Sequence, residues 1–204
     1  MAQQKLTTFA RVRALEGWRA VAFSAALLER MLPNYQLFCE LTEYDDGKTC
    51  RNCLDLLWES VKSPKSKINF SVQLEKVELL TPDTQDYDNF GVYPAIDAAI
   101  GLAAAVSLAK KDDLQGAVVV SKLSQGSVEA YLLASGEATE DNVKAHPLMQ
   151  FEVEIQNALL DCAEQGGRPA ETADALKALA LEEGISNIGI DLSSDVSDDL
   201  HSDN

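Results

Sequence analysis

The sequence has few of the residues that most often carry enzyme chemistry. Only two of its 204 residues are histidine, His146 and His201. The Glu-x-x-His motif of di-iron bundles and the His-Glu-x-x-His motif of zinc proteases are both absent, as are GxSxG, the Walker phosphate loop and GxGxxG. The sequence therefore predicts no catalytic residue and no cofactor. These absences favour a protein that is not an enzyme.

Cysteine is also scarce, and its placement predicts neither a redox centre nor a metal site. Two of the four cysteines form a Cys-x-x-Cys pair, Cys50 and Cys53, but no strand pattern precedes them, as one does in thiol oxidoreductases. Both lie on one helical stripe with Leu54 and Leu57, which predicts buried, unreactive thiols. A zinc site needs two more ligands, and the remaining cysteines and histidines are too scattered to supply them.

Basic residues are outnumbered by acidic ones, 17 to 33, which gives a net charge of −16. A surface of that sign repels nucleic-acid phosphates and anionic lipid, so we expect no direct binding to nucleic acid or membrane. It would attract a basic protein partner. A second copy of the chain, as a homodimer, is the other partner that we consider.

Long hydrophobic runs and an export signal are missing. Arg11, Arg13 and Glu16 interrupt any apolar segment near the N-terminus. The longest nearly uncharged run, Ala95–Ala109, contains Asp97 and is too short to cross a bilayer, so it predicts a buried core helix. We therefore expect a cytoplasmic protein with reduced cysteines.

Aromatic residues make up only 6% of the chain, whereas alanine and leucine recur throughout, which favours helices over sheets. Apolar residues recur with a helical period, and no convincing strand pattern appears. The prediction is an all-α, single-domain bundle of about eight to nine helices over residues 1–190. Residues 191–204 are polar and acidic, and we expect a disordered tail.

Three local patterns predict particular helix boundaries. Pro33 should end one helix near Met31 and begin a short second one. Pro94 should occupy the first position of the alanine-rich helix, with Asp97 in its first turn. Asp112 with Gln115 resembles a capping pair for the helix that follows.

Paired acids occur at several places, and we expect most of them on solvated helix faces. Asp55 with Glu59 and Glu152 with Glu154 are examples.

The segment Asp86–Asp97, which runs from the irregular connection 81–94 into the helix after it, is the candidate site for a ligand or partner. Acids and aromatic residues crowd together there, and we single out Tyr87, Asp88, Tyr93 and Asp97. The spacing of Asp86, Asp88 and Asp97 partly matches that of a calcium-binding loop. Phe90 stands at a position where a ligand is needed, so no metal is predicted. The alternative is a purely structural role, in which these residues only form the turn and the start of the helix.

Several segments resemble the YjaG-like bacterial family, catalogued as domain of unknown function 416. They are ERMLPNYQLFCE, LDLLWE, NFSVQLEKVE, FGVYPAIDAAI and SNIGI, which lie between Glu29 and Ile190. The resemblance implies a bacterial cytoplasmic protein with an all-helical fold. It transfers no catalytic residue, because it implies no assigned activity.

Two functions of different classes remain open on the sequence. The first is a non-enzymatic interaction or regulatory protein that works through a surface patch. The alternative is an enzyme or small-molecule-binding protein whose pocket between helices is lined by carboxylates and tyrosines.

Overall fold

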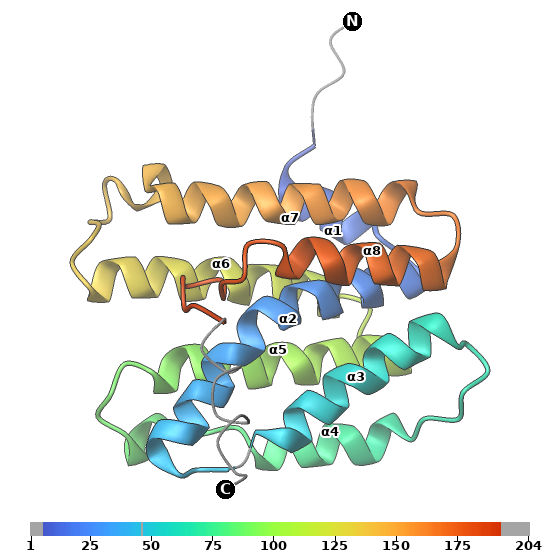
Figure 1. Ribbon diagram of the computed structural model, residues 1–204, viewed down its shortest axis with the longest axis horizontal. Coiled ribbons are helices and arrows are strands. Elements are labelled where there is room, and N and C mark those ends of the chain that lie inside the picture. The colour runs from blue at the N-terminus through green and yellow to red at the C-terminus, as the bar shows by residue number, and fades with distance from the viewer. Residues whose placement is uncertain (1–5, 46, 193–204) are drawn as a thin grey trace, which may run out of the picture.

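The computed structural model describes residues 6–45 and 47–192 (Figure 1). In this part of the chain the regular structure consists of eight α-helices and two short 3₁₀ turns, Thr84–Asp86 and Val143–Ala145. The helices are α1 (Thr8–Ala14), α2 (Gly17–Thr42), α3 (Lys48–Lys62), α4 (Phe70–Leu79), α5 (Val92–Lys110), α6 (Gly116–Ala134), α7 (Pro147–Gln165) and α8 (Pro169–Leu181). The predicted all-α single domain is therefore confirmed. The predicted disordered tail falls, apart from Asp191 and Leu192, outside the described residues.

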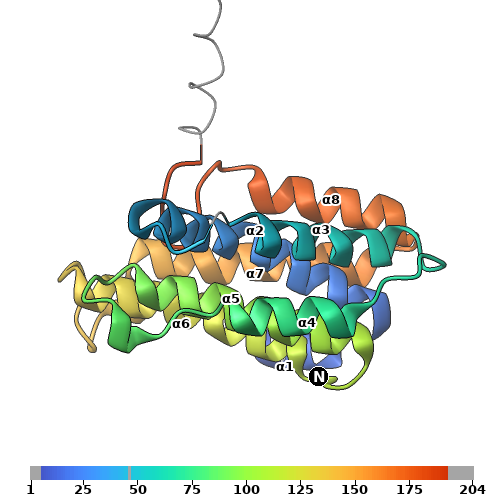
Figure 2. The ribbon, with the colours of Figure 1, turned by 90° about the horizontal axis from the view of Figure 1, so that it is seen from below.

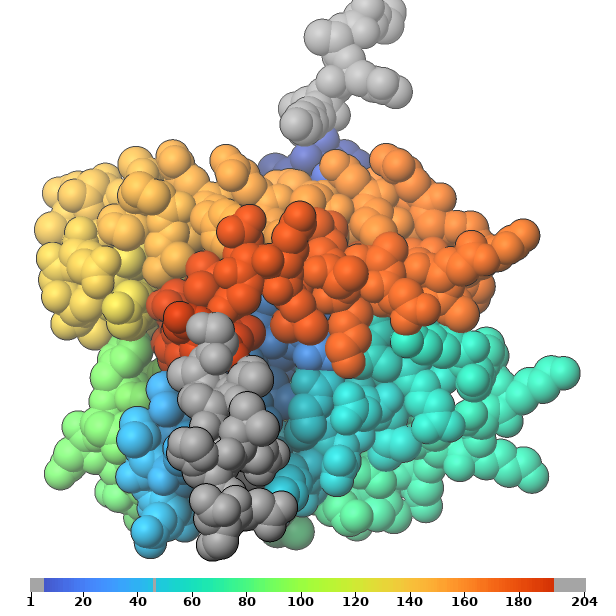
Figure 3. Space-filling model, viewed as in Figure 1, coloured from blue at the N-terminus to red at the C-terminus, as the bar shows by residue number. Residues whose placement is uncertain are grey.

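Helix α2 is the centre of the bundle. It contacts α3, α5, α6, α7 and α8, and almost every residue from Ala20 to Tyr35 is buried. On the face seen in Figure 3, α3 and α8 cover most of its first half. A helix that is apolar nearly all round is stable only when neighbours surround it, and these five helices meet that requirement.

The prediction that Pro33 ends a helix near Met31 is wrong, because α2 continues without a break to Thr42. Proline inside a helix lacks the backbone N–H and pushes on the preceding turn, so carbonyls one turn earlier lose good donors. The missing N–H of Pro33 affects the carbonyl of Glu29, and the next carbonyl, that of Arg30, accepts a hydrogen bond from the backbone N–H of Asn187, 3.0 Å away. The burial of most residues from Ala20 to Tyr35 and this donor from Asn187 stabilise the helix through the proline.

The alanine-rich helix α5 packs against α2, α4 and α6 in the interior. By length and composition alone α5 is apolar enough to cross a membrane, but most of it is buried among the other helices, as in a core helix. Its start differs from the prediction, because Val92 and not Pro94 is the first helical residue. Asp97 therefore lies beyond the first turn, and the predicted charge–dipole role for it is wrong.

The next helix also begins differently from the prediction. Helix α6 starts at Gly116, and the carboxylate of Asp113, not that of Asp112, accepts a hydrogen bond from the backbone of Gln115. A Cβ atom at Gly116 would lie 2.4 Å from the carbonyl oxygen of Ala104 on α5, so only glycine permits this close approach. The loop 111–115 is thereby held tightly against the end of α5.

The loops gather at the two ends of the bundle (Figures 1 and 2). One end carries the α1–α2 junction and the loops 63–69, 111–115 and 166–168. The other end carries the loops 43–47, 80–91 and 135–146 and the C-terminal segment 182–192. That last segment closes on itself through an isolated antiparallel bridge between Ile185 and Asp191.

Candidate functional site

The structure does not bring the four predicted site residues together. Tyr87 packs its ring against those of Phe38 and Tyr44. Asp88 is exposed in its loop, and the half-exposed Tyr93 lies beside Phe90. None of the four lines either of the two cavities described below.

Asp97 is instead held by the neighbouring helix. Its Oδ2 accepts a hydrogen bond of 2.6 Å from the hydroxyl of Ser127 on α6. Partial burial raises the pKa of Asp97, and the Ser127 hydroxyl opposes that shift. Asp97 thus joins α5 to α6, which agrees with an architectural role.

A buried polar centre lies where α2, α6, α7 and the C-terminal segment meet. Arg30 is 1% exposed and Glu152 is fully buried, with 3.5 Å between Nη2 and Oε2. Ser124 and Gln156 donate to the other carboxylate oxygen of Glu152, at 2.6 and 2.7 Å. The expectation that Glu152 lies on a solvated face is wrong. Glu154, the other acid of that predicted pair, is exposed as expected.

Asn187, in the C-terminal segment, completes the polar centre by hydrogen bonds to α6 and α2. Its Nδ2 donates to the backbone carbonyl of Ser124, and its Oδ1 accepts a hydrogen bond of 2.8 Å from Asn34. Burial raises the pKa of Glu152 above its ordinary value, although Arg30 and the two neutral donors favour the ionised form. Among the described residues Nε and Nη1 of Arg30 have no hydrogen-bond partner. The guanidinium instead lies 5.3 Å from the ring centre of Phe151.

A second buried carboxylate, Glu29, ties three helices together. It accepts two hydrogen bonds from Arg51, at 2.7 and 2.9 Å, and one of 2.7 Å from the indole of Trp58. Lys177 of α8 lies 3.2 Å away. Burial alone would raise the pKa of Glu29, but these donors outweigh it and hold the pKa below its usual value. All of these groups are committed to one another, which makes this cluster structural.

The Cys-x-x-Cys pair is buried and helical, as predicted. Cys50 and Cys53 are both 0% exposed, on the inner face of α3, and both are free thiols. Burial raises the pKa of each thiol to about 12, so neither forms a thiolate at neutral pH. Within the described ranges no group of three or more potential ligands is close enough to hold a metal ion.

A shallow pocket of about 520 Å³ lies at the end of the bundle that carries loop 135–146. Its wall includes Tyr131, Glu137, His146 and Glu183, so it is lined by a tyrosine and carboxylates, though not by the predicted ones. Nδ1 of His146 accepts from the backbone of Leu148, which leaves only Nε2 for a ligand.

A larger cavity of about 880 Å³ opens at the opposite end, where four segments that are distant in sequence converge. We call it the basic-end cavity. Its apolar wall consists of Leu15, Trp18, Ala20, Val21, Val61, Pro64, Ile68, Phe70, Leu108, Ala109 and Leu114. Arg13, Glu16, Ser60, Ser66, Lys111 and Gln115 supply its polar atoms.

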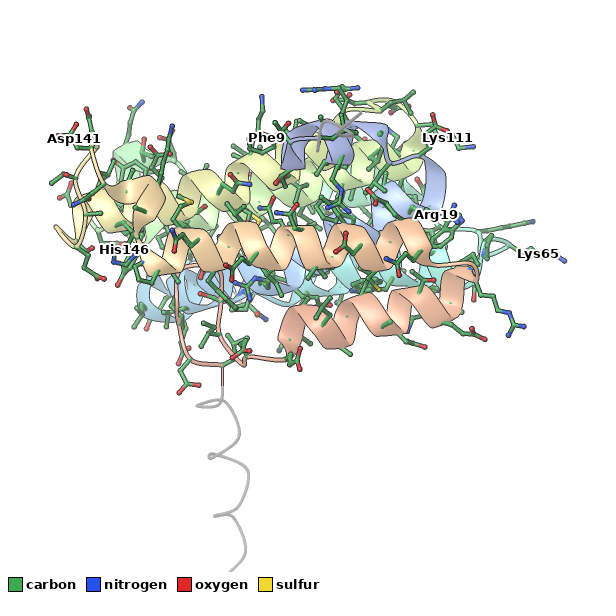
Figure 4. All side chains as sticks on the ribbon, turned by 90° about the horizontal axis from the view of Figure 1, so that it is seen from above. Phe9, Arg19, Lys65, Lys111, Asp141 and His146 are labelled. Atoms are coloured by element: carbon green, nitrogen blue, oxygen red, sulfur yellow. The ribbon has the colours of Figure 1, made fainter. Side chains whose placement is uncertain are left out.

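Two cations at the mouth of the basic-end cavity are available to a ligand. Arg13 and Lys111 are exposed and form no ion pair within the described part of the chain, whereas Lys110 pairs with Asp112. Lys65 lies at the same end as Lys111 and Arg19 (Figure 4). Since 880 Å³ is typical of a ligand pocket, an apolar group with an acidic neighbour fits this site.

Charge is distributed unequally between the two ends. The loops at the basic end carry four basic residues, Lys65, Lys67, Lys111 and Arg168, against three acidic ones. The loops at the other end, which we call the acidic end, carry eleven acidic residues in the described chain and one basic residue, Lys144. Asp141 and His146 mark the acidic end in Figure 4. A strongly acidic chain thus keeps one end locally favourable to anions.

Sequence reasoning missed the basic-end cavity because no single segment contains it. The only sequence signal was the recurrence of Lys and Arg beside helix ends, at positions 13, 65, 67 and 111.

The chain is similar in sequence and structure to several known bacterial proteins. Residues 7–191 match the family described as protein of unknown function DUF416. The chain is 42% identical to the uncharacterized protein YjaG of Salmonella typhimurium over 187 residues, which is 88% of this chain and 94% of the relative. YjaG of Escherichia coli is 41% identical over the same shares, and an uncharacterized protein of Haemophilus influenzae is 39% identical over 89% and 95%.

A solved structure supports the same assignment. The crystal structure of a DUF416 family protein from Shewanella baltica is similar with a TM-score of 0.84 and 38% identity. The similarity covers 92% of this chain and all of that one. The resemblance seen in the sequence is therefore confirmed, and the chain belongs to the DUF416 family.

Proposed function

We propose that this chain is a non-enzymatic cytoplasmic interaction protein that binds a partner through the basic-end cavity. The partner segment would place apolar side chains in the cavity and acidic side chains beside Arg13 and Lys111. The observation that carries the proposal is a mostly apolar cavity of about 880 Å³ with two unpaired cations at its mouth, on a chain of net charge −16.

The apolar wall would supply most of the affinity. Trp18, Ile68 and Phe70 are only partly buried in the free protein, so a ligand that covers them removes apolar surface from water. Each Å² of apolar surface so covered contributes roughly 25 cal/mol, before the cost of association. Arg13 and Lys111 would then select ligands of negative charge, since exposed cations contribute more to specificity than to affinity.

The most buried ionisable groups support a binding function over a catalytic one. Glu29 and Glu152 accept hydrogen bonds from neighbouring helices, and neither lines the basic-end cavity. At these positions the two carboxylates stabilise the packing of the helices and do not contact a ligand in the cavity.

A titration with anilinonaphthalene sulfonate tests the proposal, because this probe combines fused rings with one anionic group. Trp18 lies in the cavity wall and reports on occupancy by quenching. We expect saturable binding at one site. Joint substitution of Arg13→Glu and Lys111→Glu should weaken it about tenfold, as expected for two reversed surface charges.

Two further variants locate the effect. Ala109→Phe fills the cavity and should abolish binding, whereas Lys144→Glu reverses one charge at the acidic end and should leave binding unaltered. Thermal midpoints of all variants control for loss of the native fold. No saturable binding, or equal weakening by Lys144→Glu, would overturn the proposal.

A second candidate function rests on the shallow pocket at the acidic end. Tyr131 donates to Glu137 at 3.4 Å, and His146 lies 3.9 Å from the same carboxylate, so three polar groups face one cavity. This arrangement would suit a small polar ligand. A basic protein partner would also be drawn to this end by its acidic loops.

A further inference from the structure

We propose that the segment which occupies the basic-end cavity is residues 192–204 of a second copy of this chain. The inference rests on the proposed function and names its partner. It predicts head-to-tail association, in which the acidic end of one copy delivers its C-terminal segment to the basic end of another.

The sequence of that segment has the chemistry that the cavity selects. Apolar residues recur at every fourth position, as Leu192, Val196 and Leu200, so a helical segment would place them on one stripe. Four aspartates accompany them, at positions 195, 198, 199 and 203, with no lysine or arginine. A segment of this kind inserts apolar side chains while its carboxylates remain beside them.

The cavity offers the complementary surface. Its walls come from Trp18, Ile68 and Phe70, and Leu114 is 71% exposed on the loop at its edge. Arg13 and Lys111 at the mouth face incoming aspartates without a competing partner in the described chain. Glu16 is the acidic residue among the lining side chains. The lining therefore presents two cations against one anion to the approaching segment.

The starting point of the segment favours a second copy over the same chain. Ile188 packs with Val128 and Met149, which places the C-terminal segment at the acidic end. The N–H of Leu192 donates to the carbonyl of Gly184 and fixes the point of departure. From Met149 to the far end of α7 at Gln165 the helix rises about 24 Å. If residues 192–200 bound as a helix, they would rise only about 12 Å and could not reach the cavity of their own chain. If they bound in an extended form they could span about 27 Å, so the apolar stripe of a helical segment is what requires a second copy.

Charge also disfavours other modes of self-association. Two acidic ends repel each other, because eleven acidic residues of each would meet, whereas an acidic end and a basic end attract. The same attraction should weaken when salt screens it.

Sedimentation velocity of the full 204-residue chain over a wide range of protein concentration tests the inference. We expect the mass to rise from 22.1 kDa to multiples of it as concentration increases, and less so at high salt. The joint variant Val196→Asp and Leu200→Asp should remain a monomer. The joint variant Ser193→Asp and Ser197→Asp, a matched control that adds the same two charges beside the stripe, should associate as the wild type does.

The outcomes separate this inference from the proposed function. A monomeric wild type at every concentration, or association that survives Val196→Asp with Leu200→Asp, overturns the inference. If the wild type stays monomeric while the double variant binds anilinonaphthalene sulfonate about tenfold more tightly, the segment occupies its own chain's cavity, and the second copy is wrong. Probe binding that is lost in Ala109→Phe but indifferent to the C-terminal variants leaves the proposed function standing alone.

Discussion

Replacing the Arg30–Glu152 pair by neutral side chains should leave the stability within about 1 kcal/mol of the wild type or raise it, although each single replacement should destabilise the protein. The pair is buried, and its 3.5 Å separation is longer than the roughly 2.7–2.9 Å of a strong charged hydrogen bond. Two buried guanidinium nitrogens of Arg30, Nε and Nη1, also have no hydrogen-bond partner in the described chain. The attraction between the two ions and their hydrogen bonds therefore offset only part of the free-energy cost of removing both ions from water.

The size of each loss in stability depends on the charge that the variant leaves buried without a partner. Arg30→Met strands a buried carboxylate and Glu152→Gln strands a buried guanidinium, and removing one member of a buried pair costs about 3–5 kcal/mol. In a domain of this size 1 kcal/mol shifts the thermal midpoint by roughly 2–4 °C, so each single variant should melt roughly 6–20 °C lower. The double variant should lie within about 1 kcal/mol of the wild type or above it.

The Arg30→Met variant should also have a characteristic pH dependence. Burial already raises the pKa of Glu152, and loss of the cation raises it further. Above the ordinary value of 4.5 the unfolded chain releases its proton while the folded chain keeps it. The free energy of unfolding then falls by about 1.4 kcal/mol per pH unit until the folded carboxyl ionises. The deficit should be small near pH 4.5 and large at pH 7.

Urea unfolding followed by circular dichroism measures all four proteins of this double-mutant cycle. A double variant whose loss equals the sum of the two single losses would refute the reasoning, because the charges would then be uncoupled. A deficit of Arg30→Met that did not change with pH would refute the account of Glu152.

Three other features give further tests. The thiols of Cys50 and Cys53, with pKa values raised to about 12, should react with DTNB only after unfolding; rapid labelling of the native protein would contradict their burial. Glu29→Gln should cost about 1.5–3 kcal/mol at pH 7 and progressively less as the pH falls below 4.5 and through the lowered pKa of the folded carboxylate; a deficit independent of pH would count against this. At low protein concentration, deletion of residues 193–204 should move the thermal midpoint by less than roughly 2–4 °C; a larger drop would indicate that they pack on the bundle.

Those parts of the fold that depend on neighbouring residues could be predicted from the sequence. The stripe of Cys50, Cys53, Leu54 and Leu57 faces the core, as predicted, and α7 follows the same local rules, since it begins at Pro147 and is capped by Gly166. Periodicity and terminal residues act within one or two turns, so a single segment contains all the information needed.

The failure at Pro33 has a different origin. A local rule ends the helix there, but tertiary structure supplies a donor from Asn187, 154 residues further along the chain. No pattern within α2 could reveal that hydrogen bond.

The burial of Glu152 has a signal in the sequence. It falls four residues after Leu148 and three before Ile155, on the same helical stripe as Leu159. A carboxylate on an apolar stripe indicates burial with partners, whereas the neighbouring Glu154 lies off the stripe and is exposed.

The basic-end cavity could not be predicted, because its wall is assembled from the ends of several helices and two loops. Trp18, Phe70 and Lys111 are far apart in sequence and meet only once the bundle forms. Composition showed that the chain is acidic, but only the fold reveals that its scarce cations gather at one end.

The location of ligand binding is the most direct test of the central claim. Nitrogen–proton correlation spectra of the isotope-labelled 204-residue chain can be recorded during titration with anilinonaphthalene sulfonate. We predict that the amide signals that move belong to the wall of the basic-end cavity, around Trp18, Phe70 and Lys111. Movement centred instead on His146 and Phe151 at the acidic end, or no movement at all, would contradict the account.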